Sequence, residues 1–224
     1  MTTSTRKVGR PHDPELGERR REKILAAAGP LFAEKGYSAT DVDAVAKQTA
    51  VAKGTIYRYF HGKDRLFFAT VDRGMRLLRD QVERGSSGVD DPLDRINLAI
   101  RSYLSYFDAN PWLVELVIQE RACFKNRKKP TYFEHRDTSV GPWRKLFRAL
   151  IREGRIRDIP VNRITDAISD LLYGTIFTNH FSGRRKSFNA QARDVLDVLF
   201  HGILPEKERP IRFEPGRKVK GRTS

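Results

Sequence analysis

The sequence predicts an all-α protein with a small three-helix N-terminal domain and a larger C-terminal helical bundle. Apolar residues recur every three or four positions along most of the 224 residues, which is the period of amphipathic helices. No segment convincingly shows the alternation typical of a β-strand. Between residues 40 and 60, two short helical patterns separated by a turn predict a helix-turn-helix.

The first helix is expected over about residues 18 to 34. Its apolar face has helical spacing and consists of Ile24, Leu25, Ala28, Leu31 and Phe32. Gly36 is expected to end the helix in a left-handed conformation. Pro30 removes an amide donor and crowds the carbonyl of Ala26, so we expect a continuous but kinked helix.

In the helix-turn-helix stretch, Thr40 is expected to cap a short helix whose apolar face carries Val42, Val45 and Ala46. After the turn, a second helix places Ile56 and Phe60 on one face. Tyr57, Arg58 and Tyr59 lie on its other faces. Phenol hydroxyls and cations suit a helix in a DNA groove, because they reach phosphates. A core position for Tyr57 remains the competing interpretation.

The remainder of the chain is expected to be helical up to about residue 203. The expected helices cover residues 64–83, 92–107, a short segment after Asn110-Pro111, 132–152, 161–181 and 190–203. Gly141-Pro142 should break or kink the helix that contains it. We therefore expect a helix-turn-helix domain at residues 17–62 and a ligand-binding and dimerisation domain at 63–204. A disordered basic arm (1–16) and a disordered basic tail (205–224) flank them.

The composition favours a polyanionic partner. Lys and Arg total 43 against 28 Asp and Glu, giving a net charge of +15, so DNA or RNA is the first candidate and solubility alone the bland alternative. Cys123 is the one cysteine, which fits a reducing cytoplasm. The sequence has neither an apolar N-terminal signal nor a run of about 18 apolar residues, so we expect a cytoplasmic protein with no membrane association.

From Thr40 to Leu66 the sequence resembles the TetR family (TetR/AcrR) of bacterial one-component transcription regulators. The matching residues are, in order, Thr40, Val45-Ala46, Val51, Lys53-Gly54-Thr55-Ile56-Tyr57, Tyr59-Phe60, Lys63 and Leu66. Two positions depart from the family pattern. Ala50 replaces the turn glycine, and Ala52 replaces the serine that caps the recognition helix. The missing cap should cost about 1 kcal/mol.

The resemblance implies a TetR-like fold and a homodimer that binds double-stranded DNA. By motif position, the implied contacts with phosphates and base edges are Thr40, Lys53, Thr55, Tyr57, Tyr59 and Lys63, with Gly54 allowing close approach. Arg58 and His61 are further candidates. Independently of the resemblance, Arg10 in the arm could enter a narrow minor groove, although a solvated terminus is equally simple. Lys63 begins a helix, an unfavourable place for a cation unless it meets a phosphate.

The resemblance also implies a ligand cavity and a dimer interface in the C-terminal domain. The candidate cavity residues are Tyr103, Phe107, Trp112, Phe124, Tyr132, Phe133, Trp143, Tyr173, Phe177 and His180. Each could instead be ordinary core. The candidate dimer residues are Leu171, Leu172, Thr175, Thr178, Val195, Val198 and Leu199. Some of these could pack within the subunit.

The sequence thus favours a repressor released from a pseudo-palindromic operator by a small apolar or aromatic effector. The segment 64–83 would link the cavity to the DNA-binding domain. No cofactor or metal is predicted, since the five histidines lack metal-ligand spacing and no phosphate-loop or dinucleotide motif is present. An enzyme is therefore disfavoured. A ligand-independent DNA-binding dimer, architectural or regulated by a protein, remains the alternative.

Overall fold

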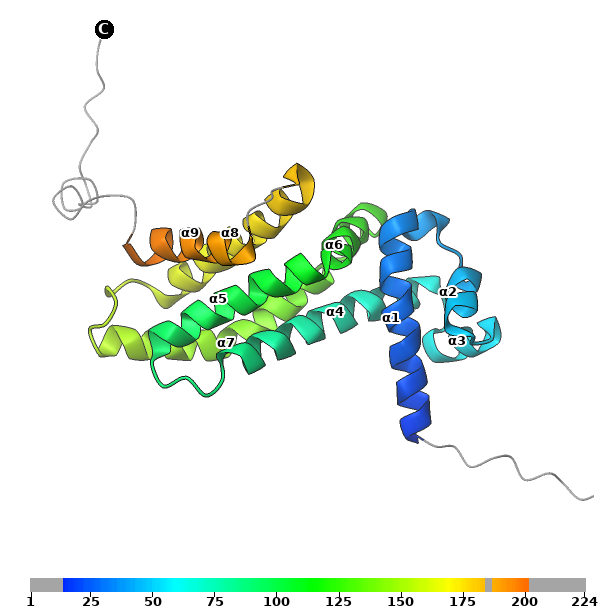
Figure 1. Ribbon diagram of the computed structural model, residues 1–224, viewed down its shortest axis with the longest axis horizontal. Helices are drawn as coiled ribbons and strands as arrows, with labels where there is room; N and C mark the ends of the chain where they lie inside the picture. The colour runs from blue at the N-terminus through cyan, green and yellow to red at the C-terminus, as the bar shows by residue number, and fades with distance from the viewer. Residues whose placement is uncertain (1–13, 184–186, 202–224) are drawn as a thin grey trace, which may run out of the picture.

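The computed structural model describes residues 14–183 and 187–201, and within these ranges it contains helices and no strand (Figure 1). The helices are α1 (Pro14–Ala39), α2 (Val42–Thr49), α3 (Lys53–Phe60), α4 (Lys63–Ser86), α5 (Pro92–Ala109), α6 (Pro111–Cys123), α7 (Thr131–Arg152), α8 (Val161–Ser182) and α9 (Phe188–His201). The all-α prediction is confirmed. Residues 1–13 of the expected arm, and the whole of the expected tail, lie outside the described residues. In the described part, no helix combines the length and apolar character needed to cross a bilayer.

Helices α1, α2 and α3 pack around one apolar core that continues into α4. Phe32 of α1, Val45 of α2 and Ile56 of α3, each on a predicted apolar face, are buried together in it, and Leu31 packs against them from the edge. In Figure 1, α1 stands across the end of α4, and α2 and α3 lie on the far side of α1 from the bundle. The short helices α2 and α3 are therefore held at one extremity of the molecule.

Helix α1 passes through Pro30 without a residue leaving helical dihedral angles, and the first non-helical residue is Gly36 (φ 79°, ψ 156°). Its ψ is extended, so Gly36 breaks the helix but does not adopt the expected left-handed cap. The neighbouring Gly29 has a packing role. A Cβ atom there would lie 2.9 Å from Cε3 of Trp112 on α6. The indole thus occupies the space that a side chain on this part of α1 would need.

One further expectation is wrong. Thr40 does not cap α2; the N-cap is Asp41, whose Oδ1 accepts the amide of Asp43 at 2.9 Å. Helix α7 is not broken at Gly141-Pro142, since the structure has Pro142 inside one continuous helix. A proline costs a helix one hydrogen bond but need not end it when the surrounding packing is sufficient.

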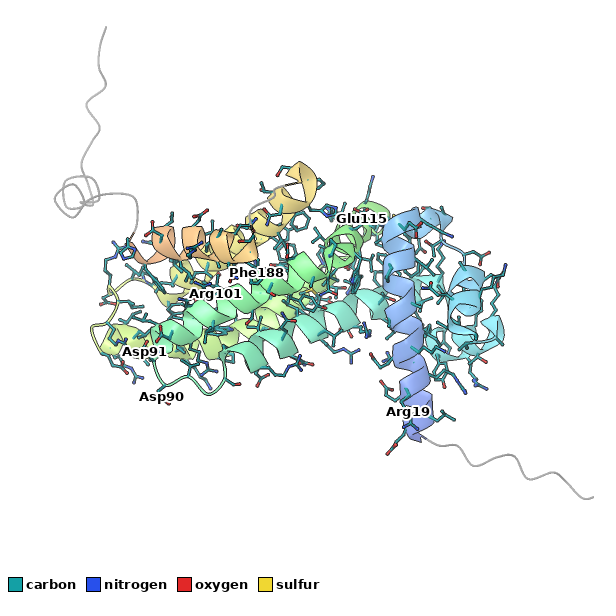
Figure 2. All side chains as sticks on the ribbon, in the orientation of Figure 1. Arg19, Asp90, Asp91, Arg101, Glu115 and Phe188 are labelled. Carbon is teal, nitrogen blue, oxygen red and sulfur yellow. The ribbon has the colours of Figure 1, made fainter. Side chains whose placement is uncertain are left out.

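The bundle is formed by α4 to α9. Helices α4, α5 and α7 run roughly along its length, while α8 and α9 cover one side (Figure 1). On that side, Arg101 of α5 reaches the start of α9 (Figure 2), where its Nη1 donates to Oδ1 of Asn189 at 3.1 Å. At the far end, Asp91 caps α5 and accepts a hydrogen bond from Arg155 at 2.6 Å. These contacts hold the framework around the cavity described below.

Candidate nucleic-acid interface and ligand cavity

The turn between α2 and α3 is built by an alanine in the left-handed region. Ala50 has φ 53° and ψ 36°, and the amide of Val51 donates to the carbonyl of Ala46 at 3.1 Å. This six-to-one closure normally uses glycine, because a Cβ atom is unfavourable at positive φ. Helix α3 then begins after Ala52, which has no side-chain acceptor for the first amides. The two departures from the family pattern therefore have structural consequences: Ala50 adopts an unfavourable backbone conformation, and α3 lacks a side-chain cap.

Helix α3 has one buried face and one free face. Ile56 and Phe60 are buried in the domain core. On the other side, Arg58 is exposed and the side chain of Tyr57 is 42% exposed. A Cβ atom at Gly54 would meet nothing within 4 Å, so the backbone there is open to approach. A core position for Tyr57 is thus excluded, while Thr55 and Tyr59 are half-buried at the margins of the free face.

Lys53 is exposed, but its ammonium group is already engaged. Nζ lies 2.8 Å from Oδ2 of Asp43 and 3.6 Å from Oδ1 of Asp41. The hydrogen bond to Asp43, with the nearby charge of Asp41, raises the pKa of Lys53. Lys53 can reach a phosphate only by exchanging these carboxylates for it.

Lys63 has an internal role at the start of α4. Its Nζ donates to the carbonyl of Ser38 at 2.9 Å and lies 4.7 Å from the centre of the Tyr37 ring. The hydroxyl of Tyr37 donates to Asp64. These contacts explain a lysine at a helix start without a phosphate, because they join the end of α1 to the start of α4. His61, which follows α3, is exposed with φ 57°.

Thr40 is 2% exposed, and its Oγ1 donates to the carbonyl of Gly36 at 2.7 Å. The expected DNA contact of this side chain is therefore contradicted by its burial. The hydroxyl instead fastens the end of α1 to the start of α2. Arg10 lies outside the described residues. The structure thus brings together Lys53, Gly54, Tyr57, Arg58 and His61 on accessible surface around α3.

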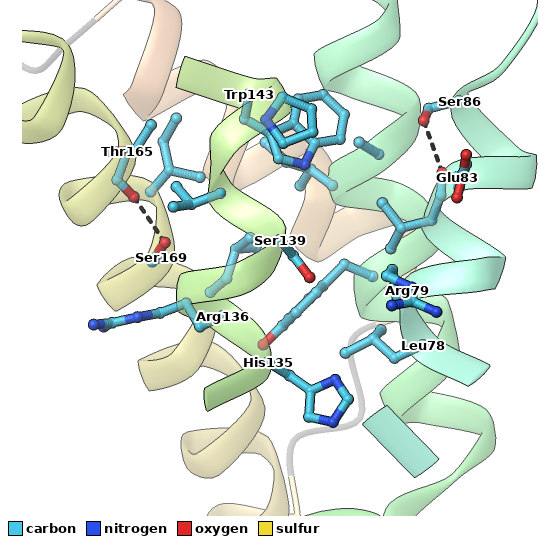
Figure 3. Close-up of a pocket in the computed structure, with 18 of the residues that line it drawn as sticks. Leu78, Arg79, Glu83, Ser86, His135, Arg136, Ser139, Trp143, Thr165 and Ser169 are labelled. Carbon is cyan, nitrogen blue, oxygen red and sulfur yellow. Dashed lines mark hydrogen bonds between the residues drawn. The ribbon is translucent and has the colours of Figure 1, made fainter. Parts of the chain in front are cut away.

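A cavity of about 430 Å³ lies among α4, α5, α7 and α8. Tyr103, Tyr132 and Trp143 line it, as expected, and the remaining wall combines aliphatic side chains and Phe147 with polar and charged groups. In Figure 3, Trp143 and His135 lie at opposite ends of the drawn site, with Ser139 of the same helix between them. A cavity of this size with apolar surface interrupted by polar groups is typical of a small-molecule site.

The other expected cavity residues lie elsewhere. Phe107 and Trp112 pack in the bundle. Phe124 belongs to an aromatic cluster, and the centre of its ring is 4.8 Å from that of Tyr37. The Phe177 ring is tilted by 39° against that of Tyr173, with the ring centres 4.4 Å apart, and His180 Nε2 lies 3.1 Å from Glu115 Oε2. Phe133 and Tyr173 line a second, separate pocket. The lining of the 430 Å³ cavity includes none of these seven residues.

Polar groups that sequence reasoning did not identify also line the cavity. They are Arg79, Glu83, Ser86, Arg95, His135, Arg136, Thr138, Ser139, Thr165 and Ser169. The α4 members could have been found by extending the buried stripe of α4 past Met75 and Leu78 at helical spacing. Within the cavity, the hydroxyls of Tyr103 and Tyr132 are 2.8 Å apart. Burial raises the pKa of Tyr103 well above its ordinary value and that of Tyr132 to about 12, so both phenols stay neutral near pH 7.

A chain of polar contacts leads from the cavity to the DNA-binding domain. His135 Nε2 lies 2.8 Å from Oδ1 of Asp72 on α4. The other carboxylate oxygen of Asp72 is 3.2 Å from Nε of Arg76, one turn further along α4. Arg76 and Arg73 in turn face Glu22 of α1, at 4.0 Å and 2.7 Å. The cavity wall and α1 are thus joined through one face of α4.

The expected dimer residues divide into two groups. Leu172 and Val195 are buried in the subunit's own core, so little of their surface is free for a second subunit. Leu171 and Val198 are exposed, Thr178 is also on the surface, and Phe181 is 71% exposed. Thr175 and Leu199 are half-buried. An unusual amount of apolar surface is therefore open on α8 and α9.

The helix-turn-helix is the part of the chain in which known proteins are most clearly similar to it. Residues 24–70 match the family described as bacterial regulatory proteins, tetR family. The chain is 35% identical over 97 residues to the HTH-type transcriptional regulator HbdR of Aromatoleum sp., a match that covers 43% of this chain and 42% of HbdR. It is 28% identical over 144 residues to the nucleoid occlusion factor SlmA of Vibrio cholerae, covering 62% and 70% of the two chains.

Among solved structures, the fold of this chain resembles the crystal structure of the transcriptional regulator FadR from Bacillus subtilis in complex with stearoyl-CoA. The TM-score is 0.68 at 22% identity, covering 82% of this chain and 99% of FadR. At this identity the likeness shows a shared fold only. The stretch that matches the tetR family model contains the whole helix-turn-helix, and the fold agrees with that of a solved transcriptional regulator over 82% of the chain, so the chain carries a helix-turn-helix similar to that of the tetR family of bacterial regulatory proteins.

Proposed function

We propose that this protein binds an operator in double-stranded DNA through α3 and acts in the cytoplasm as a repressor. The observation that carries the proposal is the two-sided character of α3. Ile56 and Phe60 anchor the helix, while Gly54, Tyr57 and Arg58 face solvent at the extremity of the molecule. A helix held in this way can enter a major groove without disturbing the core.

We further propose that a small apolar or aromatic molecule in the cavity releases the operator. The bound stearoyl-CoA of FadR makes an acyl compound one reasonable class. Helix α4 supplies Met75 and Leu78 to the cavity wall and begins at Lys63 beside the DNA-binding domain. A ligand that prefers a displaced α4 would shift the population toward a form with a wrongly placed α3.

The exposed apolar side chains of α8 and α9 support a homodimer. Leu171, Phe181 and Val198 would be covered by the same surface of a second subunit. Such a dimer presents two copies of α3 and therefore favours a pseudo-palindromic operator.

The DNA-binding proposal is tested with Arg58→Ala and with Arg84→Ala as a matched control. Arg84 is exposed near the end of α4 and lies far along the chain from α3. Genomic fragments that the protein selects supply the probe for fluorescence anisotropy. We expect Arg58→Ala to weaken binding roughly tenfold and to lower the salt slope by about 1, because one phosphate or base contact is lost. Equal affinities of the two variants would refute the role of α3.

The match to SlmA, a nucleoid occlusion factor, keeps a ligand-independent DNA-binding dimer as the second candidate. A thermal-shift screen of apolar and aromatic compounds, followed by anisotropy with every hit, discriminates the two. Operator release by a stabilising compound supports the effector-controlled repressor. If no compound stabilises the protein or releases DNA, the ligand-independent function is favoured.

A further inference from the structure

A second pocket, with a volume of about 560 Å³, lies beside the segment that joins α6 to α7. We call it the basic pocket. Arg121, Lys125, Arg127 and Lys128 line it together with the rings of Phe133 and Tyr173. No acidic residue lines the pocket, and residues 121 to 130 contain five basic and no acidic side chains. The surroundings are therefore strongly electropositive next to an aromatic surface.

Most of these cations are not neutralised within the described residues. Arg121 Nη1 donates to the backbone carbonyl of Lys125 at 3.0 Å, and no carboxylate lies within ion-pair distance of Arg121, Lys125 or Lys128. Lys129, which does not line the pocket, is paired with Asp137. The free cations are thus the ones that surround the basic pocket.

The segment is held in a fixed shape by a buried carboxylate. Glu120 has a side chain that is 1% exposed, and its Oε1 accepts Nη1 of Arg127 at 2.6 Å and the amide of Thr131 at 2.9 Å. Arg127 also donates to Glu134 at 2.7 Å and lies 4.6 Å above the ring of Phe68. These contacts hold Arg127 and the start of α7 against the buried carboxylate, so the backbone that carries Lys125 and Lys128 is tied down on the α7 side of the basic pocket.

The basic pocket and the apolar cavity are close neighbours. Tyr132 lines the cavity, and the centre of its ring lies 4.9 Å from that of Tyr173 and 5.3 Å from that of Phe133. Both of the latter line the basic pocket. The rings of Tyr132, Phe133 and Tyr173, packed against one another, therefore lie between the two spaces. A molecule with an apolar body in one space could place a charged group in the other by displacing these rings.

From these contacts we infer that the basic pocket binds a phosphorylated, nucleotide-type head group. Lysine and arginine are suited to phosphate oxygens, and the Phe133–Tyr173 pair offers apolar surface to a flat ring. The inference rests on the proposed effector function and refines it. The effector is then an apolar body joined to a phosphorylated head, and the cations select the head.

The test uses the full-length protein with ADP and inorganic pyrophosphate as probes in isothermal titration calorimetry. The variant is Lys125→Ala/Lys128→Ala. The control is Lys145→Ala/Arg148→Ala, which removes the same charge from two exposed positions of α7 outside both pockets. We expect the variant to bind ADP roughly tenfold more weakly than the wild type, because two charge-assisted contacts are lost, and the control to change affinity less than about twofold.

Pyrophosphate separates a head-group site from a site for free phosphate. The inference requires ADP to bind at least severalfold more tightly than pyrophosphate. It is overturned if the wild type does not bind ADP, if the two probes bind equally, or if both variants lose affinity to the same degree. Operator binding is measured on the same proteins. If Lys125→Ala/Lys128→Ala weakens DNA binding and leaves ADP binding unchanged, the cations belong to the DNA interface, and this inference fails while the proposed function stands.

Discussion

Ala50 offers a quantitative test of the turn between α2 and α3. With φ 53° and ψ 36°, it holds a left-handed conformation that costs an L-residue about 1–2 kcal/mol. Glycine avoids this cost but loses about 0.5–1 kcal/mol more conformational entropy on folding. The difference predicts that Ala50→Gly stabilises the protein by about 0.5–1 kcal/mol. For a chain of this size, that corresponds to a rise in Tm of about 1–4 °C.

Ala52 adds an independent change in the same turn. It caps α3 without a side-chain hydrogen bond, so Ala52→Ser should supply an acceptor and stabilise by about 1 kcal/mol. The two residues are neighbours, so the double variant need not show the sum. Differential scanning calorimetry at pH 7 measures all three proteins.

Ala26→Gly is the matched control for this prediction. Ala26 is exposed inside α1, where glycine should destabilise by about 0.5–1 kcal/mol. Opposite signs of the change in Tm at positions 50 and 26 are the expected outcome. A lower Tm for Ala50→Gly, comparable to that of the control, would refute the left-handed turn.

Three more predictions concern the bundle. The variant Asp91→Asn keeps the cap but loses the ion pair with Arg155. Because that pair lowers the pKa of Asp91, its stabilisation is present above about pH 4 and disappears at lower pH. The difference in Tm between the wild type and this variant should therefore shrink as the pH falls. The variant Glu120→Gln should lower the free energy of unfolding, measured with urea, by roughly 2–3 kcal/mol. This is less than the loss of a fully buried pair would cost, because Arg127 is partly exposed and keeps its ion pair with Glu134. An unchanged urea midpoint would contradict a stabilising role of the Glu120–Arg127 pair. Phe181→Asp should shift a dimer toward monomer in sedimentation velocity, and a variant that remains fully dimeric would show that the proposed interface does not include this residue.

The sequence predicts the architecture well because local patterns determine it. Helical spacing of apolar residues locates each helix to within a few residues, and the contrast between Ile56 and Tyr57 on α3 already indicates a buried and a free face. The missing cap at Ala52 and the unusual backbone at Ala50 were also predictable, since each follows from the chemistry of one residue in a known type of turn.

The cavity was harder to predict because it depends on how distant helices pack. Trp112 and Phe124 have the same aromatic character as Trp143, yet only Trp143 lines the cavity. The glycines at 29 and 74 leave room for the Trp112 indole against α1 and α4, a feature of three-dimensional packing that no local pattern contains. Similarly, Leu172 is buried and Leu171 is exposed because of the rotation of α8 about its axis. Both residues are apolar neighbours, so the sequence pattern does not determine that rotation.

The central claim is that α3 reads DNA sequence, and one binding measurement tests it most directly. Fluorescence anisotropy at a fixed, near-physiological salt concentration compares a duplex selected by the protein from genomic fragments with a scrambled duplex of the same length and composition. The account predicts that the selected duplex binds the wild type at least about 1,000-fold more tightly, and that Arg58→Ala binds the selected duplex roughly tenfold more weakly than the wild type does. Equal affinity of the wild-type protein for both duplexes would contradict it.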